Sequence, residues 1–172
     1  MDFIETQNYK TPYGELLLAS FQNKLCMCDW RYRKMRSAID NRIATKLGAT
    51  FVEKDNVVLQ QARNQFEEYF QSKRREFDLP LLFVGTAFQK QVWQQLMLVG
   101  FGDTASYLEL AQGIGNKNAV RAVANANGAN ALSIIVPCHR IIGSNGQLVG
   151  YAGGLETKRK LLMLEQDMFA SL

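Results

Sequence analysis

The chain has 172 residues, of which 47% are apolar and 21% charged, and it contains only three prolines. A chain of this length and composition folds into one ordinary domain or two small ones, which excludes disordered, collagen-like and proline-rich proteins. Twenty basic and sixteen acidic side chains give a net charge of +4, an excess that permits approach to a polyanion without indicating one. The apolar runs are far shorter than a bilayer span and the start has no secretory pattern, so we expect a cytoplasmic protein without a membrane segment.

Residues 1–80 are predicted to form a small α/β domain. Strand-forming residues gather at 14–20 and 25–30 on either side of a short polar turn, a pattern typical of a β-hairpin. Cys26 and Cys28 lie two positions apart on the second run, so we expect both thiols to pack on one face of that strand.

The remainder of this domain is predicted to contain one helix. Apolar side chains recur at helical spacing over 56–72. The basic stretch at 31–36 is expected to form a solvated surface. Apolar residues alternate over 77–83, where Pro80 makes the segment an edge strand or a connector.

Residues 86–172 are predicted to form a mostly helical second domain. Thr86 has the position of an N-cap ahead of a helix that begins near Ala87. Two short helices follow, over 107–114 and 117–125, with a glycine turn between them. This spacing fits a helix-turn-helix, although any helical hairpin with a short loop has the same pattern, so DNA binding stays open on this evidence.

The second of these helices has a surface of small side chains. Arg121 is its one long basic residue, whereas several long polar side chains are typical of a helix that reads bases in the major groove. A narrow helix of this kind suits close packing, either against protein or against a shallow groove wall. The small residues are Ala119, Ala122, Ala124 and Ala126.

The chemistry is expected at a thiol in the second domain. The β-branched run 132–136 predicts a buried strand, and Pro137 stops it so that Cys138 can face a pocket. His139, the single histidine, follows directly and could act on the thiol only across a bend or through a water molecule. One histidine and no metal-ligand spacing among the carboxylates and thiols predict no metal site.

A final helix is predicted over 155–168, and Glu165 lies on its expected buried face. Two interpretations of this carboxylate remain open. In the first, Glu165 fixes the tautomer of His139, and the imidazole removes the proton of Cys138 to give a nucleophilic thiolate. In the second, Glu165 is part of a fraying helix end and Cys138 is an inert core thiol.

Several motifs together resemble the O6-alkylguanine-DNA alkyltransferase family. The most specific are the segment 135–142, which contains Cys138 and His139, and the glycine-rich segment 150–155. The resemblance extends in register over 77–172, whereas the first 76 residues are similar only in their hairpin-and-helix layout. The other segments that carry it are 85–89, Val92-Trp93, Ser106-Tyr107, 121–123, Asn130 and Lys158.

The resemblance implies a small RNase H-like sheet-and-helix domain followed by a helix-turn-helix alkyltransferase domain. It also implies direct-reversal DNA repair: an alkyl group passes from O6-alkylguanine, and less readily from O4-alkylthymine, to Cys138 after base flipping. The product thioether has no carbonyl for water to attack, so each molecule is expected to act once. The lesion brings its own alkyl group, so no cofactor is expected, and the protein is expected to act as a monomer near the nucleoid.

The resemblance further implies a catalytic group of five residues. Cys138 is the acceptor, His139 reaches the thiol through water, and Glu165 lies behind the histidine. Asn130 braces the active-site turn. Tyr107 turns the nucleotide out of the stack, and its hydroxyl helps to protonate the leaving base.

The implied DNA contact is a helix in the minor groove, with Arg121 filling the space that the flipped base leaves. Such a protein must fit the groove and extrude a base, but it need not recognise the base sequence. This accounts for the absence of long polar side chains that would contact bases in the major groove. The other implied DNA-binding residues are Ala119, Ala122, Ala124 and Tyr107, and the implied substrate pocket comprises Ile141, Tyr151, Ala152 and Gly153.

Three departures from the family pattern stand out. Ala152 replaces a serine of some relatives, so backbone donors of its loop must bind the guanine oxygen. Val99-Gly100 replaces a frequent Ile-Pro pair, which is expected to loosen the approach to the first short helix. The N-terminal zinc ligands and the phosphotriester-repair domain of some relatives are absent.

Three other functions fit parts of the sequence. One is a lesion-binding protein of the same fold, but those relatives lack the acceptor cysteine. Another is a thiol hydrolase, although such enzymes generally bring cysteine and histidine from distant segments. The third is a transcription regulator that uses the helix-turn-helix alone. The complete motif around Cys138 favours alkyl transfer over all three.

Overall fold

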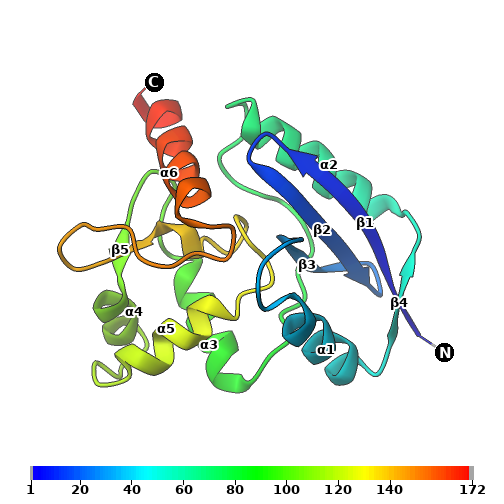
Figure 1. Ribbon diagram of the computed structural model, residues 1–172, viewed down its shortest axis with the longest axis horizontal. Coiled ribbons are helices and arrows are strands. Elements are labelled where there is room, and N and C mark those ends of the chain that lie inside the picture. The colour runs from blue at the N-terminus through cyan, green and yellow to red at the C-terminus, as the bar shows by residue number, and fades with distance from the viewer. Residues whose placement is uncertain (1, 171–172) are drawn as a thin grey trace. The chain divides into compact units, whose positions relative to one another are not determined.

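The computed structural model describes residues 2–170, with side chains described through residue 167. The chain divides into two compact units, Met1–Gly85 and Thr86–Leu172. The first contains a sheet with helices and the second is mostly helical, so the predicted α/β class is confirmed (Figure 1).

The first unit is built on a four-stranded sheet in the order β3-β2-β1-β4. Its strands are β1 (Phe3–Thr11), β2 (Gly14–Phe21), β3 (Lys24–Trp30) and β4 (Thr50–Glu53), with only the β1–β4 pair parallel. The β2–β3 hairpin is confirmed, and Gln22 and Asn23 in its turn have φ of 50° and 65°. Positive φ at both central residues is typical of a type I′ turn, whose twist matches that of the flanking strands.

Two strands and one helix of this unit were not predicted. Strand β1 is mostly polar, and β4 has only four residues that pair with β1 from a distant part of the chain. Helix α1 (Arg36–Leu47) buries only Ile39 and Ile43, so its apolar periodicity is weak.

The expected solvated surface at 31–36 is wrong for two of its arginines. Asp29 is fully buried, and its Oδ2 lies 3.1 Å from Arg33 Nη1 and 3.0 Å from Arg36 Nη1. A buried carboxylate requires such partners, so these guanidinium groups are turned inward rather than into solvent.

Helix α2 (Val57–Phe70) confirms the predicted helix, and it packs against β1 and β2. The Asn56 side chain caps it by accepting a hydrogen bond from Leu59 N at 2.9 Å. The segment 77–83 is a connector with one bridge to β3, in which Leu25 N donates to Pro80 O at 2.7 Å. Proline itself has no N–H to donate, so the contact uses only its carbonyl.

Cys26 and Cys28 are buried in β3, as predicted. Burial raises the pKa of the Cys26 thiol to about 12, despite a backbone hydrogen bond that opposes the rise. A thiol with such a pKa is almost entirely protonated near neutral pH, so it is inert as a nucleophile.

The second unit begins with helix α3 (Ala87–Leu96), which packs against α4 (Tyr107–Gly113) and α5 (Val120–Gly128). The predicted N-cap is confirmed, because Thr86 and Gln89 form a reciprocal capping box. Trp93 Nε1 donates to Ala126 O at 2.8 Å, which ties α3 to the buried side of α5.

The predicted helix-turn-helix layout is present, but the second helix begins three residues later than predicted. The preceding residues form a turn in which Ala119 N donates to Asn116 O at 3.0 Å. Ala119 is the N-cap of α5 and supplies no side-chain hydrogen bond, so the helix start has no sequence signal.

The predicted strand at 132–136 is wrong, although every residue in it is buried. The segment is a turn, closed by a hydrogen bond from Val136 N to Leu132 O at 2.8 Å. Ile134 has φ of 74°, a conformation that β-branched residues rarely adopt and that no strand contains. After it come the 3-10 helix η1 (Cys138–Arg140) and β6 (Ile141–Ile142), which pairs in parallel with β5 (Ala105–Ser106).

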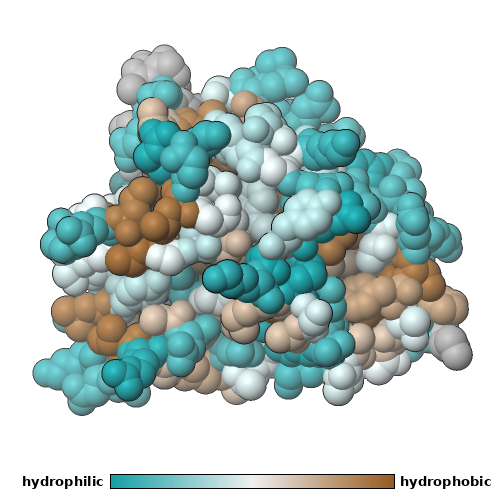
Figure 2. All heavy atoms as spheres, in the orientation of Figure 1, coloured by the Kyte–Doolittle hydropathy of each residue, from teal (hydrophilic) through white to brown (hydrophobic). Residues whose placement is uncertain are grey.

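The last element that the structure describes is helix α6 (Leu155–Ala170), close to the predicted range. No helix within residues 2–170 is long and apolar enough to cross a membrane. On the face shown in Figure 2, brown apolar patches are small and separated by hydrophilic side chains. Scattered apolar residues of this kind are normal on protein surfaces.

Candidate active site

The Cys138 thiol lies at the start of η1, directly after the buried turn, and only 4% of the residue is exposed. The backbone N–H of Cys138 donates a hydrogen bond to Val136 O at 2.7 Å. Asn130 Nδ2 donates to Cys138 Sγ at 3.2 Å. A donor aimed at the sulfur stabilises the thiolate more than the thiol.

Asn130 also holds the turn in place. Its Nδ2 donates to Val136 O at 2.9 Å and its Oδ1 accepts from Leu132 N at 2.9 Å. Buried backbone N–H and C=O groups require hydrogen-bond partners. In a strand the neighbouring strand would provide them, and here the Asn130 side chain does. The side chain therefore connects the thiol to the segment that presents it.

Replacing Asn130 by alanine is expected to lower the free energy of unfolding by about 2–3 kcal/mol, because buried Leu132 N–H and Val136 C=O lose their partners. Urea denaturation checks this. Asn125→Ala, at an exposed position of α5, is the matched control and should change stability by less than about 0.5 kcal/mol. Equal losses in the two variants would show that Asn130 does not hold the turn.

His139 and Arg140, which follow Cys138 in η1, form a buried hydrogen-bonded group with Glu165 of α6. His139 Nε2 lies 2.7 Å from Glu165 Oε2, and both side chains are at most 1% exposed. Arg140 Nε donates to Glu165 Oε1 at 2.8 Å and Arg140 Nη2 donates to Oε2 at 3.1 Å. The carboxylate thus holds a guanidinium and an imidazole at once, which fixes both side chains.

The ionisation of Glu165 follows from these contacts. Burial alone would raise its pKa, but the charge of His139 and the hydrogen bonds from His139 and Arg140 outweigh burial and lower the pKa to about 2. Glu165 is therefore a carboxylate at neutral pH. Its Oε2 can accept the His139 Nε2–H bond, which leaves Nδ1 as the acceptor nitrogen of the neutral ring.

The other ring nitrogen, His139 Nδ1, is buried and makes no hydrogen bond with any described residue. The Tyr151 ring lies across the imidazole with centroids 6.4 Å apart in a T-shaped arrangement. Such a nitrogen can accept a proton directly or through a bridging water.

Tyr107 begins α4 and is half-buried. Burial raises the pKa of its hydroxyl, a hydrogen bond with Asn127 opposes the rise, and the nearby charge of Cys138 adds to it. The Tyr107 hydroxyl is therefore protonated near neutral pH and close enough to Cys138 to feel its charge.

Arg121 and Ala122 are exposed on α5, and Ala119 and Ala124 are half-exposed. The opposite side of the helix is buried through Val123, Ala126 and Asn127. Helix α5 thus presents a narrow face of small side chains with one arginine.

The loop between β6 and α6 brings Tyr151, Ala152 and Gly153 together, and all three are half-exposed. Ile141 is fully buried. Its carbonyl accepts a hydrogen bond from Lys158 Nζ.

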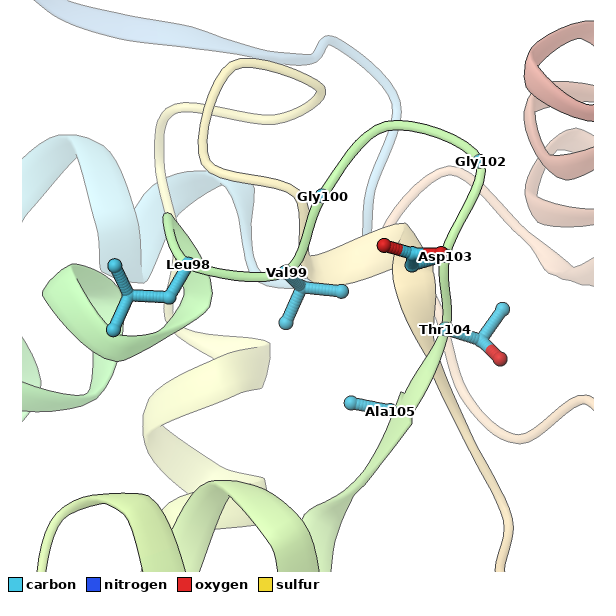
Figure 3. A pocket seen from close by; sticks show the side chains of 7 residues that line it. All are labelled: Leu98, Val99, Gly100, Gly102, Asp103, Thr104 and Ala105. Atoms are coloured by element: carbon cyan, nitrogen blue, oxygen red, sulfur yellow. The ribbon is translucent and has the colours of Figure 1, made fainter. Parts of the chain in front are cut away.

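The loop between α3 and β5 lines a solvent-open hollow of about 500 Å³. Figure 3 shows that Asp103 and Ala105 point to the inside of this loop and Thr104 to the outside. The expected loosening at Val99-Gly100 is offset at two points. Arg140 Nη1 donates to Val99 O at 2.7 Å, and Gln166 Nε2 donates to Gly102 O at 2.6 Å.

Among the described residues, no group of three or more histidine, cysteine, aspartate or glutamate side chains could hold a metal ion.

Two buried basic residues of this site, Arg140 and Lys158, lie in segments that carry the family resemblance, but the sequence analysis gave neither a role. A signal for Lys158 was present, because it lies three residues before Leu161 and seven before Glu165 on one stripe of α6. A lysine on a buried stripe requires polar partners. Arg140 follows the thiol motif directly, but its contact with a glutamate 25 residues away has no sequence signal.

Comparison with known proteins identifies the class of protein. Residues 6–83 match the ribonuclease-like domain of 6-O-methylguanine DNA methyltransferase, and residues 87–167 match its DNA binding domain. A methylated-DNA--protein-cysteine methyltransferase of Methanosarcina barkeri is 42% identical over 158 residues, which cover 92% of this chain and 94% of the relative. A constitutive enzyme of the same name from Bacillus subtilis is 38% identical over 163 residues, covering 91% of this chain and 92% of the relative.

Solved structures agree with the sequence relatives. The crystal structure of Mycobacterium tuberculosis OGT in complex with DNA has a TM-score of 0.80 at 36% identity, covering 96% of this chain and 94% of that one. The chain belongs to the methylated-DNA--protein-cysteine methyltransferase family.

Proposed function

We propose that this protein repairs DNA by moving the alkyl group of O6-alkylguanine, and less readily of O4-alkylthymine, onto its own Cys138. One observation carries the proposal. The buried Cys138 thiol accepts a hydrogen bond from Asn130, and the next residue, His139, is paired with Glu165. The sequence relatives are named as methyltransferases that act on methylated DNA, and their named acceptor is a protein cysteine.

The thiol is activated by His139. The imidazole accepts the Cys138 proton at Nδ1 through a bridging water, while Glu165 holds Nε2–H and stabilises the ring when it becomes charged. The thiolate sulfur then attacks the alkyl carbon. A carbon–sulfur bond forms, the carbon–oxygen bond breaks, and the O6 oxygen keeps the electron pair.

The leaving guanine needs donors where its negative charge develops. The protonated hydroxyl of Tyr107 donates a hydrogen bond to the leaving base. The guanine O6 atom accepts hydrogen bonds from backbone N–H groups of the segment 151–153, because Ala152 has no serine hydroxyl to donate. The product thioether cannot be hydrolysed, so Cys138 is consumed in one turnover.

DNA is bound through the minor groove by α5, whose narrow alanine face permits close approach. Arg121 enters the duplex where the nucleotide has been turned out, and Tyr107 crowds the phosphate. All these residues come from one unit of one chain, which supports action as a monomer, and a DNA substrate supports a place at the nucleoid in the cytoplasm.

The stoichiometry of transfer tests this function. The protein, mixed with an excess of methylated duplex, should gain one methyl group per chain by intact mass and then stop. Turnover past one equivalent would indicate a thiol hydrolase or another catalytic enzyme. An unmodified protein that still binds the duplex would indicate a lesion-binding protein.

Arg121→Ala is expected to slow repair of methylated duplex by tenfold or more, while transfer from free O6-benzylguanine changes less than twofold. The free base needs no extrusion, so only the duplex reaction loses the group that occupies the vacated space. Paired single-turnover rates check this, and Lys24→Ala, exposed in the first unit, controls for the lost charge. Equal losses on both substrates would show that Arg121 has no role in base extrusion.

A further inference from the structure

Lys158 is a fully buried lysine on α6, the helix that packs against η1, where Cys138 lies, and the relay described above does not use it. Its Nζ donates to the carbonyls of Ile141, Val149 at 2.6 Å and Gly150 at 3.3 Å. An ammonium has three N–H donors, and three acceptors surround it. These acceptors come from β6 and from positions 149–150 of the loop that joins β6 to α6, so Lys158 ties this loop to β6.

The three acceptors are neutral carbonyls, and Lys158 forms no ion pair with any carboxylate whose side chain the structure describes. A buried charge without a countercharge is costly. The lysine charge is therefore the feature that requires an explanation.

The charges around Cys138 show what could balance it. Tyr107 on α4 and Lys158 on α6 interact with the charge of Cys138, and Glu165 on α6 binds His139 and Arg140, which follow Cys138 in η1. The Arg140 and Glu165 charges cancel, and Tyr107 is neutral. While Cys138 is a thiol, no group of this set carries a negative charge that could balance Lys158.

We propose that Lys158 is a positioning residue whose ammonium is the countercharge of the Cys138 thiolate and whose three hydrogen bonds hold the loop between β6 and α6. The proposal rests on the alkyl-transfer function and names a second source of thiol activation besides His139. When the Cys138 proton passes to His139, the net charge of the buried group does not change, and the thiolate that forms is balanced by the Lys158 ammonium as well as by the imidazolium.

The interaction acts on both partners. Burial lowers the pKa of Lys158 to about 8, and the negative charge of Cys138 opposes this lowering. By the same coupling, the ammonium favours the ionised form of the thiol. Conversion of Cys138 to a neutral thioether removes the negative charge that raises the pKa of Lys158, so this pKa should then fall.

The first test measures the Cys138 thiol pKa from the pH dependence of its reaction with iodoacetamide, with the modified peptide identified by mass. Lys158→Met is expected to raise this pKa by at least about one unit. Lys158→Arg keeps the charge and should restore most of the shift. Lys160→Met, an exposed neighbour on the same helix with the same change of charge, should leave the thiol pKa unchanged.

The rate of transfer from free O6-benzylguanine separates this role from a structural one. If the lysine acts through the thiolate, the loss in Lys158→Met is at least about tenfold near neutral pH and is recovered as the pH rises. A loss that stays constant across pH, with an unchanged thiol pKa, would overturn the proposal. The iodoacetamide measurement uses no DNA, so its outcome is independent of whether the protein repairs alkylated DNA.

A measurement on the unsubstituted chain covers the case in which the lysine variants do not fold. The pKa of Lys158 is followed by NMR of lysine labelled with carbon-13, before and after Cys138 is capped with iodoacetamide. The capped protein should show a lower Lys158 pKa, because the countercharge is gone. An unchanged lysine pKa would overturn the proposal.

Discussion

Cys138→Ser is expected to abolish alkyl transfer from methylated duplex, with no methyl group gained by intact mass at any protein concentration. A serine hydroxyl stays protonated where the thiol is ionised, and oxygen is a much poorer nucleophile toward a saturated carbon. The substitution is nearly isosteric, and the Asn130 donor that faces the sulfur can also bond a hydroxyl. The fold and the affinity for DNA should therefore be retained.

The chain contains its own controls for this experiment. Cys26 and Cys28 are buried in the first unit, and burial holds the pKa of Cys26 near 12. Cys26→Ser and Cys28→Ser should therefore still accept one methyl group, on Cys138. Methylation of Cys138→Ser, or loss of transfer in the two controls with folding intact, would place the acceptor elsewhere.

The parts of the fold that were predicted are those with local signals. The capping residue Thr86 and the apolar spacing of α2 are readable within a dozen residues. Strand β4 was not readable, because its four residues become a strand only by pairing with β1. The turn at 132–136 was read as a strand because β-branched residues favour strands, whereas Asn130 outside the run supplies the hydrogen bonds that decide its conformation.

In the candidate site, too, the features with local sequence signals were predicted and the contacts between distant segments were not. The thiol and its neighbouring histidine are adjacent in the chain, so their proximity could be predicted. The partners that determine their charges lie on α6, and helical periodicity placed Glu165 on the buried face without identifying what it meets. Arg140 was not predicted as a second partner of this carboxylate, although the guanidinium holds both of its oxygens. Contacts between segments about 25 residues apart require the folded chain.

Glu165→Gln is expected to lower the free energy of unfolding by about 3–5 kcal/mol at neutral pH and to slow transfer. The amide cannot balance Arg140, so a buried guanidinium is left without a countercharge. It also stabilises a protonated His139 less well than a carboxylate does, so removal of the thiol proton is harder. Urea denaturation and single-turnover transfer rates measure the two losses. Glu156→Gln, at an exposed position of the same helix, should change neither by more than a small amount.

The effect of pH on stability identifies the charge of Glu165 as the cause. Its pKa is about 2 in the folded protein and 4.5 when unperturbed, which corresponds to about 3 kcal/mol. A carboxyl whose pKa is lowered by folding contributes its stability above the unfolded pKa and loses it as the pH falls through the folded pKa. The stability difference between the unsubstituted chain and Glu165→Gln should therefore be full above pH 4.5 and shrink toward pH 2. A difference that is independent of pH would mean that packing, rather than charge, makes Glu165 necessary.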